Sequence, residues 1–298
     1  MIFNNLAFHS TMDLKQIFPI ESGSDSYIFN CAQLDHFFER CITWHWHSFF
    51  ELNYIMEGEI ELRTTNSVYT LKEGDISFVN SGVIHHVSAK DKMKGCRLCS
   101  FFFDIHFLTG MYNTALKHKY ILPVLKNRKL QAYTIRPNTY ERVCMIQNFL
   151  KMLKLDEQEL FGYEFELRTE LSRFWCAFLK ETENLRDPNT ESSSVDTKRM
   201  KCMLQYIHNH YMEKISLEDI AGSANICSRE CSRCFQRNMQ TSPMSYLKEY
   251  RIRMAAQMLL QTDQSIMAVG DNCGFSSGSY FTKTFQEFMG CTPKEFRK

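Results

Sequence analysis

The chain has 298 residues, of which 44% are hydrophobic and 23% are charged, and these proportions are typical of globular domains. They exclude collagen-like, fibrous and wholly disordered proteins. No segment approaches the roughly 18 consecutive apolar residues that a membrane helix needs. Residues 1–16 lack the charged start and apolar run of a signal peptide. We therefore expect a protein of the cytoplasm with no membrane partner.

Charge and cysteine usage are uneven and informative. Residues 196–298 contain 14 Lys and Arg against 10 Asp and Glu, whereas the preceding residues contain 21 against 24, so a basic region follows an acidic one. The 12 cysteines have no repeated spacing. This pattern indicates buried or free thiols in a reducing compartment rather than a disulfide framework.

Hydrophobic patterns divide the chain into successive parts. Between residues 41 and 103, short aromatic and β-branched segments alternate with turns, which predicts a sheet of hairpins. From Asn138 onward apolar residues recur at helical spacing, first to about Leu153 and then over 158–180, which predicts two amphipathic helices. The polar, Ser-rich segment that follows is typical of a linker. The expected parts are a sheet domain over 1–136, a helical element over 137–180, a linker over 181–195 and a helical domain over 196–298.

The region after the linker contains an internal repeat. Residues 235–243 and 285–293 share the pattern F-Q-x-x-M-x-x-[ST]-P at an offset of 50, whereas matches upstream have an offset of 49. Each copy predicts a helix, a tight turn and a second helix. We expect Ser216 to cap the first helix of the first copy, and Ser276 to cap the second helix of the second copy. A helix from Pro243 to about Leu260 should join the copies.

The second helix of each copy is predicted to be amphipathic, with an outer face rich in basic and polar side chains. Such a face fits the major groove of DNA, although a single helix of this kind is more often only a solvated surface. The joining helix, about 27 Å long, would hold the two outer faces about one DNA turn, ~34 Å, apart. Tyr280, Phe281 and Phe285 are expected to face inward. The outward residues, and hence the predicted DNA-binding residues, are Arg229, Arg233, Gln236, Arg237, Ser277, Ser279 and Lys283.

Residues 215–298 resemble the DNA-binding domain of AraC/XylS-type transcriptional regulators, on the runs YLKEYRIRMAAQMLL and CGFSSGSYFTKTFQEFMGCTPKEFR. The resemblance implies two helix-turn-helix units joined by a linker helix, with double-stranded DNA as the partner. Carried over by position, it places base contacts at Arg229, Arg233, Ser279 and Lys283. Arg237 lies one turn further along, where a phosphate contact is expected.

Two positions depart from the family pattern. Gly270 stands where the family usually has Ala, and this should loosen its helix by ~1 kcal/mol. Cys227 occupies the usual cap position of the first recognition helix, and Ser228 is the alternative cap.

A second resemblance lies in the sheet domain. His45, His47, Glu51 and Gly58 match H-x-H-x3-E-x6-G, and His85 follows two spaced glycines downstream, with Asn80 where a proline is usual. These are similar to the two cupin motifs and imply a small double-stranded β-barrel. In one continuous strand, His45, His47 and Glu51 would share a face of the sheet. Three imidazoles and a carboxylate are also a ligand set for Fe, Mn, Zn or Ni.

The chemistry of these residues leaves three interpretations open. They hydrogen-bond to one another or to an effector, they hold a metal for structure or sensing, or they catalyse a metal-dependent reaction. The fused DNA-binding region favours the first, with no resident cofactor and no enzyme activity. The alternative is a metal-dependent cupin enzyme fused to a DNA-binding module. The predicted effector-binding residues are His45, Trp46, His47, Glu51 and His85, and the aromatic residues expected near them, most of them in the core, are Trp44, Trp46, Phe49, Phe50, Tyr54 and Phe78.

Together these patterns predict an α+β multidomain protein, with an N-terminal cupin-like double-stranded β-barrel plus helices and a C-terminal all-α tandem helix-turn-helix domain. The expected function is a sequence-specific transcriptional regulator that responds to a small-molecule effector. The helical element of residues 137–180 lies where the resembled family usually dimerises, which predicts a homodimer. RNA polymerase is a further expected partner if the protein activates transcription.

Overall fold

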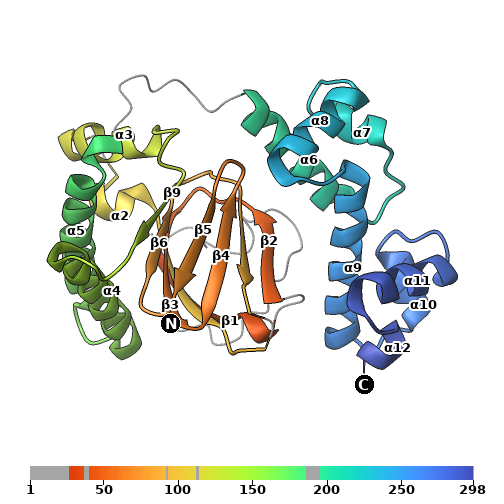
Figure 1. The fold of residues 1–298 in the computed structure, drawn as a ribbon, viewed down its shortest axis with the longest axis horizontal. Helices are drawn as coiled ribbons and strands as arrows, with labels where there is room; N and C mark the ends of the chain where they lie inside the picture. Colours follow the sequence, from red (N-terminus) through yellow and green to blue (C-terminus); the bar gives the residue numbers. More distant parts are fainter. Residues whose placement is uncertain (1–26, 37–39, 92, 112–113, 186–194, 298) are drawn as a thin grey trace. The chain divides into compact units, whose positions relative to one another are not determined.

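The computed structural model describes residues 27–36, 40–91, 93–111, 114–185 and 195–297 (Figure 1). The chain divides into two compact units at the end of the helices that follow the sheet domain. None of the described helices is long and apolar enough to cross a membrane.

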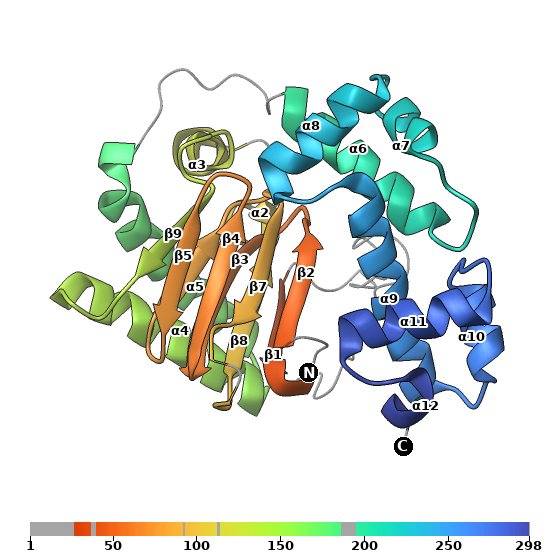
Figure 2. The ribbon, with the colours of Figure 1, turned by 45° about the vertical axis from the view of Figure 1, so that its right-hand side comes forward.

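The described part of the first unit is built on two antiparallel sheets, as expected for a double-stranded β-barrel (Figures 1 and 2). One sheet has the order β1 (Tyr27–Gln33), β8 (Arg97–Phe103), β3 (Phe50–Glu57), β6 (Ile76–Val79) and β9 (Ala132–Ile135). The other has the order β2 (Cys41–His45), β7 (His85–Ala89), β4 (Glu59–Thr64) and β5 (Val68–Lys72).

Two long helices cover the outer face of the β1-containing sheet. They are α4 (Tyr140–Gln158), which Thr139 caps by accepting a hydrogen bond from the Arg142 backbone N–H, and α5 (Tyr163–Glu181). Aromatic side chains fill the interface, since the ring centroids of Phe50 and Trp175 lie 5.1 Å apart and those of Phe78 and Phe178 lie 4.5 Å apart. The two predicted amphipathic helices are therefore present, and their apolar faces form the main core of this unit.

Short helical elements complete the first unit. They are the 3-10 turn η1 (Leu34–His36), α2 (Ile105–Thr109), the π-helical turn η3 (Lys117–Ile121), α3 (Leu122–Leu125) and the 3-10 turn η4 (Glu183–Leu185). Because α5 extends through Glu181 and η4 follows it, the start of the segment predicted as a linker is helical. Residues 186–194 of that segment lie outside the described residues.

Over its described residues, 195–297, the second unit is built from helices and turns and repeats itself. Its elements are α6 (Val195–His210), α7 (Leu217–Ser223), α8 (Ser228–Met239), α9 (Pro243–Gln261), α10 (Ile266–Asn272), α11 (Gly278–Met289) and α12 (Pro293–Phe296). Helices α8 and α11 begin and end 50 residues apart, and α7 and α10 begin and end 49 residues apart. The predicted repeat is thus a structural one, and Figure 2 shows its two copies placed along α9.

The expected cap of the second recognition helix was wrong by one residue. Ser277, not Ser276, caps α11, since its side chain accepts a hydrogen bond from the Tyr280 backbone N–H. Ser276 is the extra residue that the second copy carries in its turn. In the first copy Cys227 holds the cap position without a side-chain bond, and Ser228 is already the first residue of α8.

Gly270 has a packing role that its sequence position did not reveal. A Cβ atom at Gly270 would lie 2.8 Å from Cδ1 of Phe281, and Phe281 is fully buried on α11. At the equivalent positions the first copy has Ala221 and Cys231, which are both buried. The larger aromatic ring of the second copy is therefore accommodated by the smaller residue opposite it.

We predict that Gly270→Ala destabilises the protein, because the clash with Phe281 outweighs the gain in helix propensity. Overpacking a core typically costs about 1–3 kcal/mol, against a propensity gain of up to ~1 kcal/mol. The matched control is Gly222→Ala in α7, where an added Cβ has no neighbour within 4 Å, and this change should not destabilise. Urea denaturation of the full chain measures both, and a Gly270→Ala variant as stable as the wild type would contradict the packing argument.

Candidate functional site

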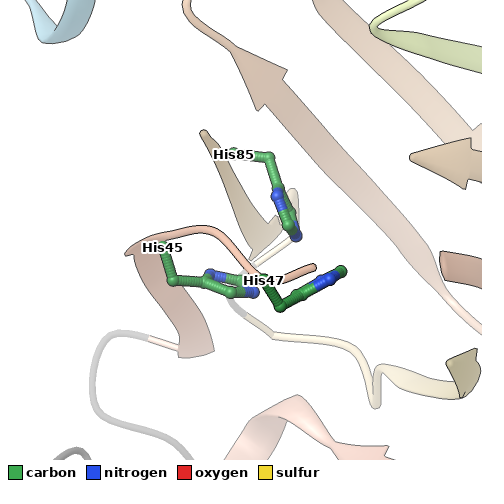
Figure 3. Close-up of side chains that lie close together, drawn as sticks. All are labelled: His45, His47 and His85. Atoms are coloured by element: carbon green, nitrogen blue, oxygen red, sulfur yellow. The ribbon is translucent and has the colours of Figure 1, made fainter. Parts of the chain in front are cut away.

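The histidines and the glutamate of the cupin-like motif meet inside the barrel, although they do not share one strand. His45 ends β2, and its register partner on β7 is His85, the first residue of that strand. His47 lies in the connection that leaves β2, and Glu51 is the second residue of β3 in the other sheet. The expectation of a single strand face was therefore wrong, because the chain crosses between the two sheets after His45. The convergence itself was predicted correctly, as Figure 3 shows for the three rings.

The four side chains are close together and buried. One ring nitrogen from each of the three histidines lies within 4.8 Å of those of the other two. Oε2 of Glu51 is 3.1 Å from Nε2 of His47 and 3.0 Å from Nε2 of His85. The exposed fractions are 8% for His45, 6% for His47, 4% for Glu51 and 0% for His85. Water is therefore largely excluded from the centre of this cluster.

Each histidine is also held by the backbone. The Nδ1 atoms lie within hydrogen-bond distance of carbonyl oxygens two residues away, and a carbonyl oxygen can only accept. Each Nδ1 then carries a hydrogen, and Nε2 is the atom that His47 and His85 direct at Glu51. The pairs are His45 with Thr43 at 2.7 Å, His47 with Phe49 at 3.1 Å and His85 with Val83 at 2.9 Å.

Burial and neighbouring charges set the ionisation of the cluster. Burial lowers the pKa of His45 well below its usual range, and the neighbouring His85 and His47 lower it further. Burial alone would raise the pKa of Glu51, but His85 and His47 outweigh it and hold that pKa well below its usual range. Glu51 is therefore an ionised carboxylate in a site that excludes water. Such a group requires a positive or hydrogen-donating partner.

Aromatic residues adjoin the cluster, but only some of those expected. Phe49 lies next to His47, and so does Phe102 of β8, whose ring is edge-on to the imidazole with centroids 5.2 Å apart. The partly buried Trp46 belongs to the same connection as His47. Sequence reasoning missed Phe102, although its position opposite Glu51 follows once β3 and β8 are paired.

The other predicted aromatics pack elsewhere. Phe50, Tyr54 and Phe78 lie on the outer face of their sheet, in the core shared with α4 and α5. Along β3 the side chains of Phe50 and Tyr54 alternate with that of Glu51, and Phe78 of β6 pairs with Leu52, which lies on the same face as they do. All three therefore point away from the cluster. Trp44 lies near His86, with ring centroids 5.6 Å apart. The prediction that all six aromatics surround the site was thus too broad.

A row of polar side chains crosses the inner face of the β1-containing sheet, two residues along β3 from Glu51. Pairing between the strands aligns Asn30, Ser100, Asn53 and Ser77, and all four are buried. The Asn53 amide donates to Ser77 Oγ at 3.3 Å, and the Ser100 hydroxyl donates to Asn53 Oδ1. The barrel therefore has a polar layer beneath the histidine cluster, which the sequence analysis did not identify.

The second candidate site is formed by the exposed faces of α8 and α11. All the predicted DNA-binding residues are exposed, whereas Cys231, Cys234 and Phe235 of α8 and Phe281 and Phe285 of α11 are buried. The expectation for Tyr280 was wrong, because its side chain is 48% exposed. Its position in the first turn of α11 adds an aromatic ring to the outer surface. The exposed residues are Arg229, Arg233, Gln236 and Arg237 on α8, and Ser277, Ser279 and Lys283 at α11.

Three of these residues have intramolecular partners, and for Arg233 the partner is Oε2 of Glu230 at 3.9 Å. Ser277 caps α11, so its hydroxyl oxygen is engaged by a backbone N–H. Arg237 donates to Oδ2 of Asp196 on α6 at 2.6 Å and to Oε1 of Glu230 at 3.4 Å. This ion pair fixes α8 against α6 and leaves Arg229 and Arg233 at the N-terminal half of the exposed face.

The two domains match known families. Residues 28–135 match the AraC-like ligand binding domain, and residues 220–298 match a helix-turn-helix domain. The chain is 28% identical to the uncharacterized HTH-type transcriptional regulator YdeC of Bacillus subtilis over 257 residues, 86% of each chain. It is 23% identical to the melibiose operon regulatory protein of Escherichia coli over 261 residues, which cover 86% of this chain and 83% of that protein.

Among solved structures, apo ToxT from Vibrio cholerae aligns with 92% of this chain and 98% of its own, at a TM-score of 0.49 and 14% identity. The family matches and the duplicated helix-turn-helix units together define the class. The chain belongs to the AraC-type transcriptional regulators, in which a ligand-binding domain is joined to a DNA-binding domain.

Proposed function

We propose that this regulator reads a bipartite DNA site through α8 and α11 and is controlled by a small-molecule effector bound inside its barrel. The duplicated helix-turn-helix carries the proposal, because both copies expose equivalent faces of their second helices. The same residues of α8 and α11 that are exposed in the structure are the proposed DNA contacts. The proposed effector contacts are His45, Trp46, His47, Glu51 and His85.

The residue types on the two outer faces suit different parts of DNA. Arg229 and Arg233 can each donate two parallel hydrogen bonds to guanine, and Lys283 at the matching position of α11 can donate to a base or a phosphate. Ser279 is compatible with several bases. Gln236 and Arg237 lie further along α8, toward the phosphate backbone. The net positive charge of residues 196–298 favours the same partner.

The barrel offers a polar centre with apolar walls, which is the usual character of a small-molecule site. The ionised Glu51 and the imidazoles supply acceptors, Phe49 and Phe102 supply aromatic surface, and the row through Asn53 supplies further hydrogen-bonding groups. A small polar organic molecule, such as a sugar, matches this lining. Because the relatives of the chain are transcriptional regulators, we propose binding rather than catalysis in this barrel.

A homodimer and RNA polymerase complete the proposed partners. Leu160 and Phe161, between α4 and α5, and Phe165, in the first turn of α5, are exposed apolar side chains. Exposed apolar clusters on helices are typical of subunit interfaces, which supports the α4–α5 pair as the dimerisation element. Contact with RNA polymerase would follow if the protein activates transcription. The proposed location is the cytoplasm.

The two kinds of DNA contact predict different mutant behaviour. Arg233→Ala and Lys283→Ala should each relax one position of the DNA site and cost about 1–3 kcal/mol, because a base contact is lost. Arg237→Ala should weaken binding to all sequences alike, because a phosphate contact and the attachment of α8 to Asp196 are both lost. Selection of binding sites from a random DNA pool with each variant measures the difference. An unchanged specificity profile for Arg233→Ala would show that the face of α8 has been assigned wrongly.

Asp196→Asn separates the two roles of Arg237. It removes the carboxylate partner and leaves the outer face of α8 unchanged, so it should reproduce the part of the uniform loss that comes from the attachment of α8 to α6. If Arg237 contributes only by contacting a DNA phosphate, the Asp196→Asn variant should instead bind DNA more tightly, because the Arg237 guanidinium is released from its ion pair.

For the effector, we predict that His47→Ala abolishes ligand binding but leaves DNA binding without ligand unchanged. A thermal-shift screen of sugars and small polar organic compounds against the wild-type chain identifies a ligand, and the same compound is then tested on the variant. His86→Ala is the matched control, because His86 adjoins the cluster in sequence but lies beside Trp44. A compound that shifts His47→Ala as much as the wild type would place the effector elsewhere.

A further inference from the structure

Two cysteines face each other across the edge of the β1-containing sheet. Cys31 of β1 and Cys99 of β8 are register partners, and no other two cysteines are paired between the strands of the described residues. Side chains directly opposite each other in an antiparallel pair point to the same face. Here that face is the outer one, since Cys99 lies in the core shared with α4 and α5 and Cys31 packs against it.

The spacing of the two strands suits a disulfide bond. Opposed residues of antiparallel strands have Cα atoms about 4.5 or 5.5 Å apart, and a disulfide joins Cα atoms about 4.4–6.8 Å apart. The Cβ atoms, about 4.5–5.5 Å apart in a sheet, have to approach to roughly 3.5–4.5 Å. The edge position of β1 allows this small movement, because among the described strands β1 pairs with β8 alone.

The two thiols differ as the members of a reactive pair do. Cys31 is partly exposed, whereas Cys99 is completely buried. A hydrogen bond from Cys99 is the largest influence on Cys31 and lowers the pKa of its thiol, and the same bond together with burial raises the pKa of Cys99. The thiolate is the nucleophile in cysteine chemistry. Cys31 is therefore the residue that meets an oxidant first, and the sulfur of Cys99 lies beside it.

We propose that Cys31 and Cys99 form a reversible redox site that a small peroxide oxidises to a disulfide. With hydrogen peroxide, the Cys31 thiolate attacks one oxygen, the O–O bond breaks, and hydroxide leaves as Cys31 becomes a sulfenic acid. That hydroxide takes up the proton that the Cys31 thiol lost. The Cys99 sulfur then attacks the Cys31 sulfur, an S–S bond replaces the S–O bond, and the second water leaves with the Cys99 proton. Two thiols are oxidised and one peroxide is reduced to two water molecules.

Access rather than charge selects the oxidant. Glu157 and Arg97 both act on Cys31, and their charges change the pKa of its thiol in opposite directions. The partial burial of Cys31 favours a molecule as small as hydrogen peroxide. Cysteines of a reducing compartment form disulfides transiently, and such disulfides are usually catalytic or redox-sensing. The free thiols of the structure are thus the resting form of this site.

The disulfide would act on the polar layer of the barrel interior. Asn30 and Ser100 are the neighbours of Cys31 and Cys99 along β1 and β8, and they are themselves register partners. Their side chains point to the inner face, because successive residues of a strand alternate. A bond that draws the two strands together would therefore also move this pair. Since the layer belongs to the proposed effector lining, this regulatory consequence rests on the proposed function, whereas formation of the bond does not.

Peptide mapping of the wild-type chain tests the bond directly. Reduced full-length protein is treated with hydrogen peroxide, its remaining thiols are alkylated, and its peptides are analysed by mass spectrometry without reduction. We expect a crosslink between Cys31 and Cys99 that dithiothreitol removes. The exposed Cys176, Cys202 and Cys227 show whether the oxidant has acted. Their oxidation without a crosslink between Cys31 and Cys99 would overturn the proposal.

Variants assign the roles of the two thiols. In Cys99→Ser the sulfenic acid of Cys31 meets no second thiol, so dimedone, which reacts with sulfenic acids, should label Cys31. In Cys31→Ser, dimedone should label Cys99 at least about tenfold less, because burial shields that thiol. Equal labelling of the two would overturn the assignment of Cys31 as the attacking thiol. Circular dichroism checks folding, and the wild-type mapping decides if a variant does not fold.

Cys96→Ser is the matched control. Cys96 is also buried and directly precedes β8, but its thiol donates to the Glu59 carbonyl oxygen at 3.8 Å. This variant should form the crosslink between Cys31 and Cys99 as the wild type does. Loss of that crosslink in a folded Cys96→Ser chain would contradict the pairing.

The outcomes separate this proposal from the proposed function. A wild-type chain that forms no crosslink removes the redox site and leaves the effector site intact. For the regulatory consequence, the compound found in the thermal-shift screen is tested on the oxidised and the reduced chain. A crosslinked chain that this compound stabilises as much as the reduced chain supports the redox site and removes its link to the effector.

Discussion

The buried face of α9 is the constraint on which the DNA-binding unit depends. Both helix-turn-helix copies pack against this one helix, and the contacts differ in kind. On the side of the first copy, Tyr246 packs near Phe235 of α8, with ring centroids 6.0 Å apart. On the side of the second copy, Met258 lies 3.6 Å from the Cys273 sulfur, and the Lys248 ammonium lies over the Phe288 ring. A straight helix with two occupied faces fixes the separation of the recognition helices, and fixed separation is what a bipartite DNA site requires.

A second constraint acts within the ligand-binding domain. The chain crosses from one sheet to the other between His45 and Phe50, and this crossing brings residues of both sheets to one point. The outer face of the β1-containing sheet is filled by aromatic packing against α4 and α5, so polar residues are restricted to the inner face. The barrel interior is therefore the place where charge and hydrogen-bonding groups collect. Sensing chemistry and core packing occupy opposite faces of the same strands.

The features predictable from sequence were those that depend on local spacing. The offset of 50 residues between the copies placed α8 and α11 correctly, and the H-x-H-x3-E spacing placed His45, His47 and Glu51 at one site. The alternation of side chains along a single strand was the wrong reason for predicting that site. The residues between His45 and Phe50 are as aromatic as those of a strand, so the sequence does not show that the chain crosses between the two sheets there. Tyr280 was assigned inward, but at the offset of 50 residues it corresponds to Glu230 of α8, which is not buried either.

Other features depend on contacts between distant residues and could not be read from one sequence. Gly270 is small because Phe281 is large, and that relation appears only when α10 and α11 are packed together. Phe102 joins the histidine cluster only through the pairing of β3 with β8. The ion pair between Arg237 and Asp196 joins α8 to α6, and its two residues are 41 positions apart in the sequence. Helical periodicity predicts that Arg237 is exposed, but it does not show which partner the side chain has.

The most direct test of the central claim is the dependence of DNA affinity on the spacing between the two halves of the selected site. If α9 holds the recognition helices rigidly, the halves should lie about one helical turn, roughly 10 base pairs, apart. Insertion of half a turn should then reduce affinity to that of a single half-site, because the second helix would face the wrong side of the duplex. Equal affinity for sites with and without the insertion would contradict the account, because the two units would then bind independently of α9.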